Sequence, residues 1–94
     1  MAMYRAWMTD AVNGNEGVYD FDGRDDLFDD TPVRIVRTFM EHVDQDLFPR
    51  EHIDYEINAA LKHGQHKAVT AMGTLILRKG GPGLPFTLFI AEKN

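Results

Sequence analysis

The chain has 94 residues, of which 44% are apolar and 27% charged, a balance typical of one small globular domain over residues 1–94. It has no cysteine, so disulfide bonds, thiolate zinc sites and iron–sulfur clusters are excluded. The net charge of −5 disfavours nucleic-acid binding, and no apolar run approaches the roughly 20 residues needed to span a membrane. We expect a cytoplasmic protein with no cofactor, no nucleic-acid partner and no membrane partner.

The N-terminal segment predicts a β-hairpin. Residues 4–12 mix apolar and polar residues with strong β-formers, as strands do. The Asn- and Gly-rich residues 13–17 predict a turn, and residues 18–21 can return as a short second strand.

A long helix over about residues 31–47 is the clearest element. Asp30 or Thr31 can cap its N-terminus, and Pro32 suits its first turn because the missing N–H costs little there. One apolar stripe recurs at spacings of three and four residues: Val33, Val36, Phe39, Met40, Val43 and Leu47. Pro49 ends the helix because it disfavours helical geometry at the residue before it.

Three strands follow the helix. Residues 53–62 fit a helix or a strand, and the strand is favoured because alternation keeps Tyr55 with the other apolar residues. Residues 67–78 and 86–92 are strand-like and are separated by glycine-rich residues 79–83. The element order β(β)αβββ predicts an α+β, two-layer fold with one long helix on an antiparallel sheet of four to five strands.

The alternating pattern also predicts how the first two of these strands pair. If odd positions of residues 53–61 lie beside odd positions of residues 69–77, Tyr55 faces Gly73, and an aromatic ring covers a glycine. This register needs a loop of odd length, such as His63-Gly64-Gln65.

The last two strands are apolar on both faces, because Met72 and Ile76 point away from Leu75, and Phe86 points away from Phe89. One helix covers only one face of a sheet. The N-terminal hairpin or another subunit must cover the second face, since soluble monomers rarely expose a large apolar patch. We expect a homo-oligomer with Met72 and Ile76 at a contact.

The acidic stretch, residues 20–30 with the sequence DFDGRDDLFDD, accounts for the whole net charge. It holds six acids and one base, so the other 83 residues hold nine of each. Matching Gly23 to the glycine of a calcium loop places four acids at ligand positions: Asp20, Asp22, Asp26 and Asp29. Val18 stands at the first ligand position and has no side-chain oxygen, so the segment is not an EF-hand. A weak divalent-metal binder remains an alternative.

Leu27 and Phe28 lie within the acidic stretch and have two interpretations. They can tuck inward and pin the loop to the core, which is favoured because a chain of this size needs every large apolar group it can bury. Alternatively, they are interaction residues that present an apolar anchor to a basic protein partner.

No catalytic residue is indicated. His63 and His66 flank a turn, but two imidazoles are too few for a zinc site. The Gly80-Gly81-Pro82-Gly83 segment lacks the Lys-Ser/Thr pair of a phosphate loop, and the chain has no serine.

The sequence therefore favours a non-enzymatic, homo-oligomeric interaction or assembly module. The alternatives are a weak divalent-metal binder through residues 20–30, and a small-ligand-binding protein or minor enzyme. The ligand pocket would lie between helix and sheet, near four large side chains: Trp7, Tyr55, Phe39 and Met40.

Overall fold

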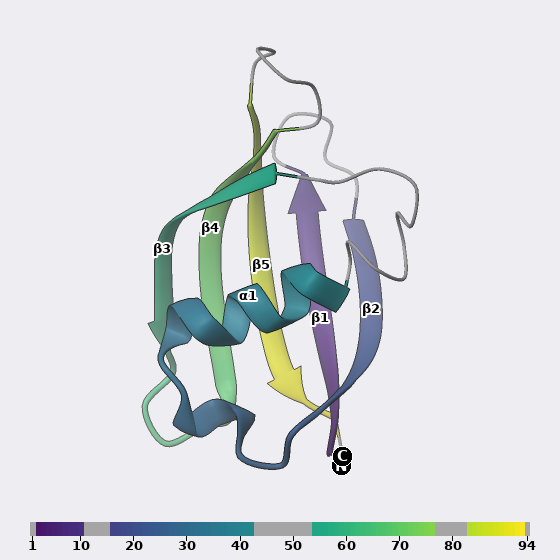
Figure 1. Ribbon diagram of the computed structural model, residues 1–94, viewed down its shortest axis with the longest axis vertical. Coiled ribbons are helices and arrows are strands. Elements are labelled where there is room, and N and C mark those ends of the chain that lie inside the picture. Colours follow the sequence, from purple (N-terminus) through teal and green to yellow (C-terminus); the bar gives the residue numbers. More distant parts are fainter. Residues whose placement is uncertain (1, 11–15, 43–53, 77–82, 94) are drawn as a thin grey trace.

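The structure is a computed structural model that describes residues 2–10, 16–42, 54–76 and 83–93 (Figure 1). Its elements are β1 (Ala2–Asp10), β2 (Glu16–Gly23), the short 3-10 helix η1 (Leu27–Asp29), α1 (Pro32–His42), β3 (Asp54–Lys62), β4 (Ala68–Ile76) and β5 (Leu84–Glu92). The strands form one antiparallel sheet in the order β2-β1-β5-β4-β3. The predicted α+β class, with one helix on an antiparallel sheet, is confirmed, and residues 53–62 are a strand as favoured.

The N-terminal hairpin extends the sheet instead of covering it. β1 pairs with β2 on one side and with β5 on the other, so the two ends of the chain lie side by side (Figure 1). The hairpin therefore does not cover the second face of the sheet, which was one of the two alternatives expected from the sequence.

α1 begins where the sequence predicts but is shorter than expected. The Arg34 N–H donates to Thr31 Oγ1 at 3.4 Å, so Thr31 is the capping residue. The described helix has 11 residues, whereas about 31–47 was expected, and residues 43–47 lie outside the described part of the chain. The predicted long helix is therefore shown only as far as His42.

The buried face of α1 differs from the predicted stripe at one edge. Its buried residues are Ile35, Val36, Phe39 and Met40, while Val33 is 39% exposed. Ile35 takes the core position because helical residues at i, i+1, i+4 and i+5 share one broad face. The buried face of α1 thus includes Val36 but leaves Val33 outside it.

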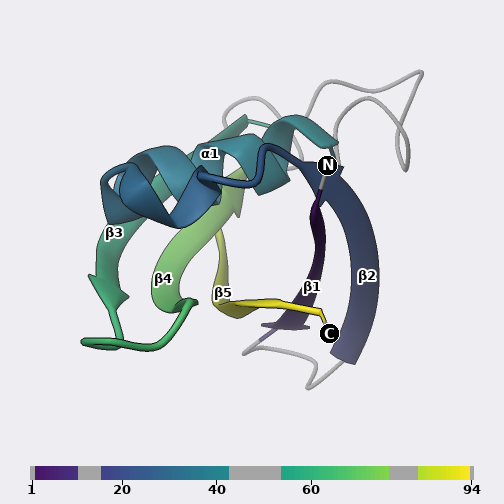
Figure 2. The same ribbon diagram turned by 90° about the horizontal axis from the view of Figure 1, so that it is seen from below.

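The core lies between α1 and the concave face of the sheet, which curls around the helix (Figure 2). Aromatic rings from the hairpin reach the helix: the centroids of Tyr4 and Phe21 are 5.5 Å apart, and those of Phe21 and Phe39 are also 5.5 Å apart. Such edge and tilted contacts add to the free energy of burial. The hairpin is therefore held to the helix by side chains as well as to β5 by backbone hydrogen bonds.

The predicted β3–β4 register is wrong by two residues at Tyr55, which lies opposite Leu75, although odd residues face odd residues there as predicted. β3 also contains an irregularity between Ile57 and Ala59. Ile57, and not Tyr55, lies opposite Gly73. Beyond the irregularity, odd residues of β3 pair with even residues of β4, as a bulge of one residue requires. Leu61 consequently moves to the face away from the helix, where it is 65% exposed.

An aromatic ring does cover Gly73, but it belongs to Phe86 on the neighbouring strand. A Cβ atom at position 73 would lie 2.6 Å from the Phe86 ring and would also collide with the backbone oxygen of Glu56. Phe86 is 2% exposed and pairs with Gly73 across β4 and β5. The glycine therefore makes room for one of the largest core side chains.

We predict that Gly73→Ala destabilises the fold by about 1–3 kcal/mol, because the added methyl group must displace the Phe86 ring. Urea denaturation followed by circular dichroism measures this loss. Thr87→Ala, at an exposed position of β5, is the control and should stay within about 0.5 kcal/mol of the parent. Equal stabilities of the two variants would contradict this account.

Candidate functional site

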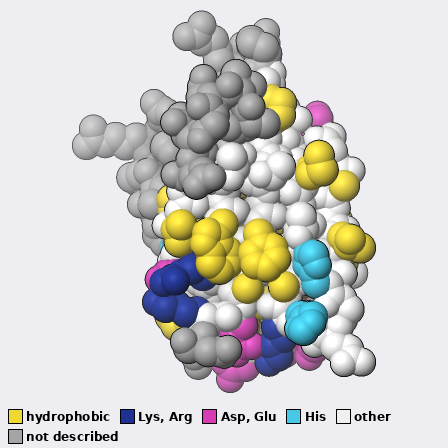
Figure 3. Space-filling view, turned by 180° about the vertical axis from the view of Figure 1, so that it is seen from behind, with side chains coloured by type: hydrophobic (Ala, Val, Ile, Leu, Met, Phe, Trp, Pro, Cys, Tyr) yellow, Lys and Arg dark blue, Asp and Glu magenta, His cyan; other side chains and the backbone are white. Residues whose placement is uncertain are grey.

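The candidate site is the sheet face opposite α1, called the open face here. One residue from each strand forms a line across it, called the central row: Val18, Trp7, Phe89, Thr70 and Leu61. Each is the direct cross-strand neighbour of the next, so at about 4.8 Å per strand the row runs roughly 19 Å across the sheet. Figure 3 shows apolar side chains gathered across the middle of this face.

The apolar side chains of the open face are large and exposed. Trp7 is 40% exposed, Phe89 37% and Met72 55%, and the ring centroids of Trp7 and Phe89 are 5.4 Å apart. Met72 stands on β4, two residues from the central row, beside Thr87 of β5. Large apolar side chains exposed together on one face are typical of an interaction site.

A shallow depression of about 560 Å³ adjoins the central row on the side away from Met72. The small residues Ala68 and Ala91 pair across β4 and β5 on the open face, and both line it. Phe89 and His63 also line it, with their ring centroids 5.8 Å apart, and His63 Nε2 hydrogen-bonds the hydroxyl of Thr70. Gln65, His66 and the ion pair of Lys67 with Glu92, at 3.1 Å, complete the lining, so the depression is a hollow over two alanines with rings and charged groups around it.

An ion-pair cluster marks one corner of the open face. The Arg5 guanidinium donates to Asp20 at 2.8 and 3.2 Å, and Lys93 Nζ donates to the same carboxylate at 2.9 Å. These hydrogen bonds, first from Arg5 and then from Lys93, hold the pKa of Asp20 well below its ordinary value. Asp20 therefore fastens β2 and the C-terminal end of the chain to β1.

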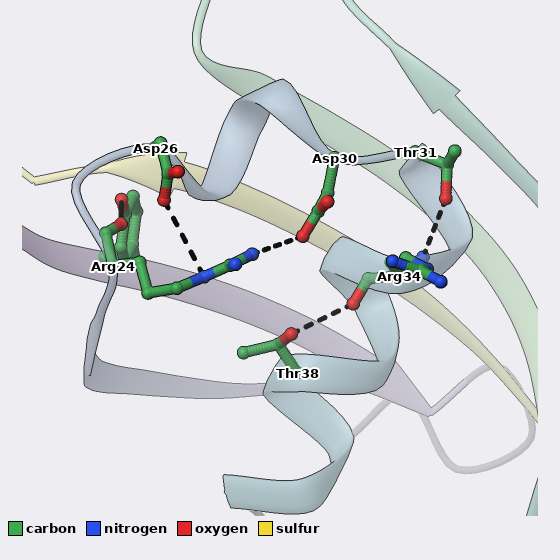
Figure 4. Close-up of polar contacts among 7 residues, drawn as sticks. Arg24, Asp26, Asp30, Thr31, Arg34 and Thr38 are labelled. Atoms are coloured by element: carbon green, nitrogen blue, oxygen red, sulfur yellow. Dashed lines mark hydrogen bonds and ion pairs between the residues drawn. The ribbon is translucent and has the colours of Figure 1, made fainter.

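Two further acids of the acidic stretch, Asp26 and Asp30, are paired with Arg24 within the loop (Figure 4). The Arg24 guanidinium contacts the carboxylates of both Asp26, at 3.7 Å, and Asp30. Within the described residues, no group of three or more His, Asp or Glu side chains is arranged to hold a metal ion. The candidate ligands are also separated: Asp20 and Asp22 lie on β2, whereas Asp26 and Asp29 lie at η1.

Leu27 and Phe28 point toward the core. Leu27 is 1% exposed, and the half-buried Phe28 ring packs edge-on against Tyr4 with centroids 5.5 Å apart. The Tyr4 hydroxyl donates to the backbone carbonyl of Arg24, and burial raises the pKa of that hydroxyl. Leu27 is accordingly placed to pin the loop and is not available as an exposed contact.

Of the four residues expected to line a pocket between helix and sheet, Tyr55 packs against the core that holds Phe39 and Met40, but Trp7 does not join them. Trp7 lies on the open face, whereas Phe39 and Met40 are buried on the other side of the sheet. That part of the ligand-site expectation is wrong, because strand alternation sends Trp7 away from its neighbours Ala6 and Met8.

Of the two predicted contact residues on β4, Met72 is exposed on the open face, and Ile76 lies half-buried at the strand end, opposite Asp54. Sequence reasoning missed Trp7 and Phe89 as the centre of that face. Alternation within residues 86–92 did separate Phe89 from Phe86, but only the pairing of β1 with β5 brings Trp7 beside it.

We predict that Asp20→Asn lowers the melting temperature at pH 7, because Arg5 and Lys93 then lose their shared carboxylate. Since the pKa of Asp20 is lowered in the folded protein, its ionised carboxylate stabilises the fold above the ordinary aspartate pKa of about 3.9. This contribution fades as the pH falls below that value. Thermal denaturation at pH 7 and at lower pH should show the two proteins converging in acid. Asp22→Asn, on the same strand, is the control, and a pH-independent difference would contradict this role.

We predict that Leu27→Ala costs about 2–5 kcal/mol of stability, because it empties a fully buried site between the loop and the core. Val33→Ala, at an exposed apolar position of α1, is the matched control. Chemical denaturation of both variants measures the difference. A loss for Leu27→Ala no larger than that of the control would rule out the pinned loop.

No helix within the described residues is long and apolar enough to cross a membrane. Comparison with protein-family models, with curated proteins and with solved structures found no match. The function is therefore inferred from the residues and geometry of the open face.

Proposed function

We propose that this protein is a non-enzymatic assembly module that associates with copies of itself through the open face. The observation that carries the proposal is the exposure of Trp7, Phe89 and Met72 on the same face of the sheet. Aromatic residues and methionine are enriched at the centres of protein interfaces, where they contribute most of the binding free energy.

The two edges of the sheet are less suited to self-association than its open face. An antiparallel β2–β2 pair would bring Asp20 and Asp22 close to the same acids of the second copy, and like charges across a strand pair repel. On the other edge, β3 carries an irregularity next to Ile57, and such bulges obstruct strand addition. Contact through the face avoids both obstacles.

The curvature of the sheet limits the size of the contact. Because the sheet curls around α1, the open face is convex, and two such faces meet mainly along β1, β5 and β4 (Figure 2). Contacts of this extent fall at the low end of the interface range, below about 1,200 Å² in total. We therefore expect weak, reversible association.

The depression beside Phe89 supports a second candidate, a small-ligand-binding protein. Its lining combines the Phe89 ring with the imidazoles of His63 and His66, which suits a flat ligand. Such a protein would stay monomeric at all concentrations and would lose ligand affinity on Phe89→Ala.

Met72→Lys should abolish self-association, because it places a charge in the middle of the apolar contact. Sedimentation velocity from about 1 µM to 1 mM covers association free energies of roughly 8 to 4 kcal/mol. The parent protein should form dimers within this range and Met72→Lys should not.

Val33→Lys is the matched control, because Val33 is a similarly exposed apolar residue on the helix side of the molecule. It should dimerise like the parent. A parent protein that remains monomeric up to 1 mM would exclude self-association as the function.

A further inference from the structure

We infer that two copies pack with their open faces together about a two-fold axis that runs along the central row. Met72 of each copy then fills the depression over Ala68 and Ala91 of the other. This arrangement rests on the proposed self-association and adds the symmetry and the contacts of the pair.

The positions of large and small residues on β4 lead to this symmetry. Thr70 lies on the central row, Met72 lies two residues to one side of it, and Ala68 lies two residues to the other side. All three side chains are on the open face, because strand residues two apart point the same way. A half-turn about the row therefore carries Met72 onto the place occupied by Ala68.

The shapes at these two places are complementary. Met72 is 55% exposed, and methionine is a flexible, polarizable side chain that fills irregular gaps. Ala68 and Ala91 are the smallest side chains lining the depression of about 560 Å³, which is bordered by the Phe89 and His63 rings and by the ion pair of Lys67 with Glu92. The half-turn provides two such contacts, one at each side of the axis.

The neighbouring residues on β5 and β3 agree with the same axis. Thr87 lies beside Met72, so the half-turn sets it over Ala91 without a clash of charges. On β3, Glu56 lies on one side of the row, and the turn with His63 and His66 lies on the other. The half-turn directs the acid toward the imidazoles of the second copy, whose ring N–H groups can donate hydrogen bonds to a carboxylate.

The competing two-fold axis, parallel to β5, fits less well. It would set Ala91 against Ala91 and would place Arg5, which pairs with Ala91, over Ala68 of the second copy. Met72 would then lie over β1 of the second copy, because β1 and β4 flank β5. This alternative sets the Arg5 guanidinium, which is bonded to Asp20, against the apolar floor of the depression and takes a charge out of water there.

Single cysteines test the arrangement directly, since the chain has no cysteine of its own. Met72→Cys and Ala91→Cys proteins are mixed at a concentration where dimers form and are treated with a short bismaleimide. A covalent dimer should form in the mixture, because the half-turn brings position 72 of one copy beside position 91 of the other. Neither protein alone should cross-link, because position 72 is about 13 Å from position 72 of the second copy along the strands, and the same holds for position 91. Thr70→Cys, on the axis, should cross-link to itself.

The outcomes separate this inference from the proposed function. Val33→Cys, on the helix side, sets the background level of chance cross-linking. Dimers in sedimentation that fail to give the Met72–Ala91 link would overturn this axis but leave self-association intact. Cross-linking of Ala91→Cys with itself would establish the axis parallel to β5 instead. Absence of dimers altogether would remove both proposals.

Discussion

The pairing of β1 with β5 is the contact on which the rest of the molecule depends. It runs from Tyr4 opposite Glu92 to Asp10 opposite Phe86, and so joins the two ends of the chain into one sheet. Pairing strands that are so distant in sequence costs chain entropy. Burial of apolar side chains on the helix side of the two strands must offset this cost. Ala6 and Ile90, both 0% exposed and directly paired, lie in the middle of that burial.

The same pairing creates the two unlike faces of the sheet. β5 alternates strictly, with Phe86, Leu88 and Ile90 turned to the helix and Phe89 turned away. The helix and the curl of the sheet enclose the first set, and the pairing with β1 sets Trp7 against Phe89 on the other side. Among the described residues, a single helix on a five-stranded sheet thus leaves one apolar face without a covering layer. The proposed self-association would cover that face.

The acidic stretch supports the fold in three different ways. Asp20 ties β2 to Arg5 and Lys93, Asp30 binds the neighbouring Arg24, and Leu27 enters the core. These roles use both the charge and the apolar residues of a segment that resembles a metal loop in composition alone. The segment still gives the protein an acidic pole, and that pole lies on β2 and η1, away from the centre of the open face.

The sequence by itself determined the class of the fold, the order of its elements and the start of the helix, because these depend on local periodicity and capping at residues such as Thr31. It also indicated that the last strands are apolar on both faces. Only the tertiary structure decided the register of β3, where one extra residue near Ile57 reverses which side chains face the core. It also decided that Trp7 meets Phe89, because the pairing of strands from opposite ends of the chain leaves no mark in the local sequence of either strand.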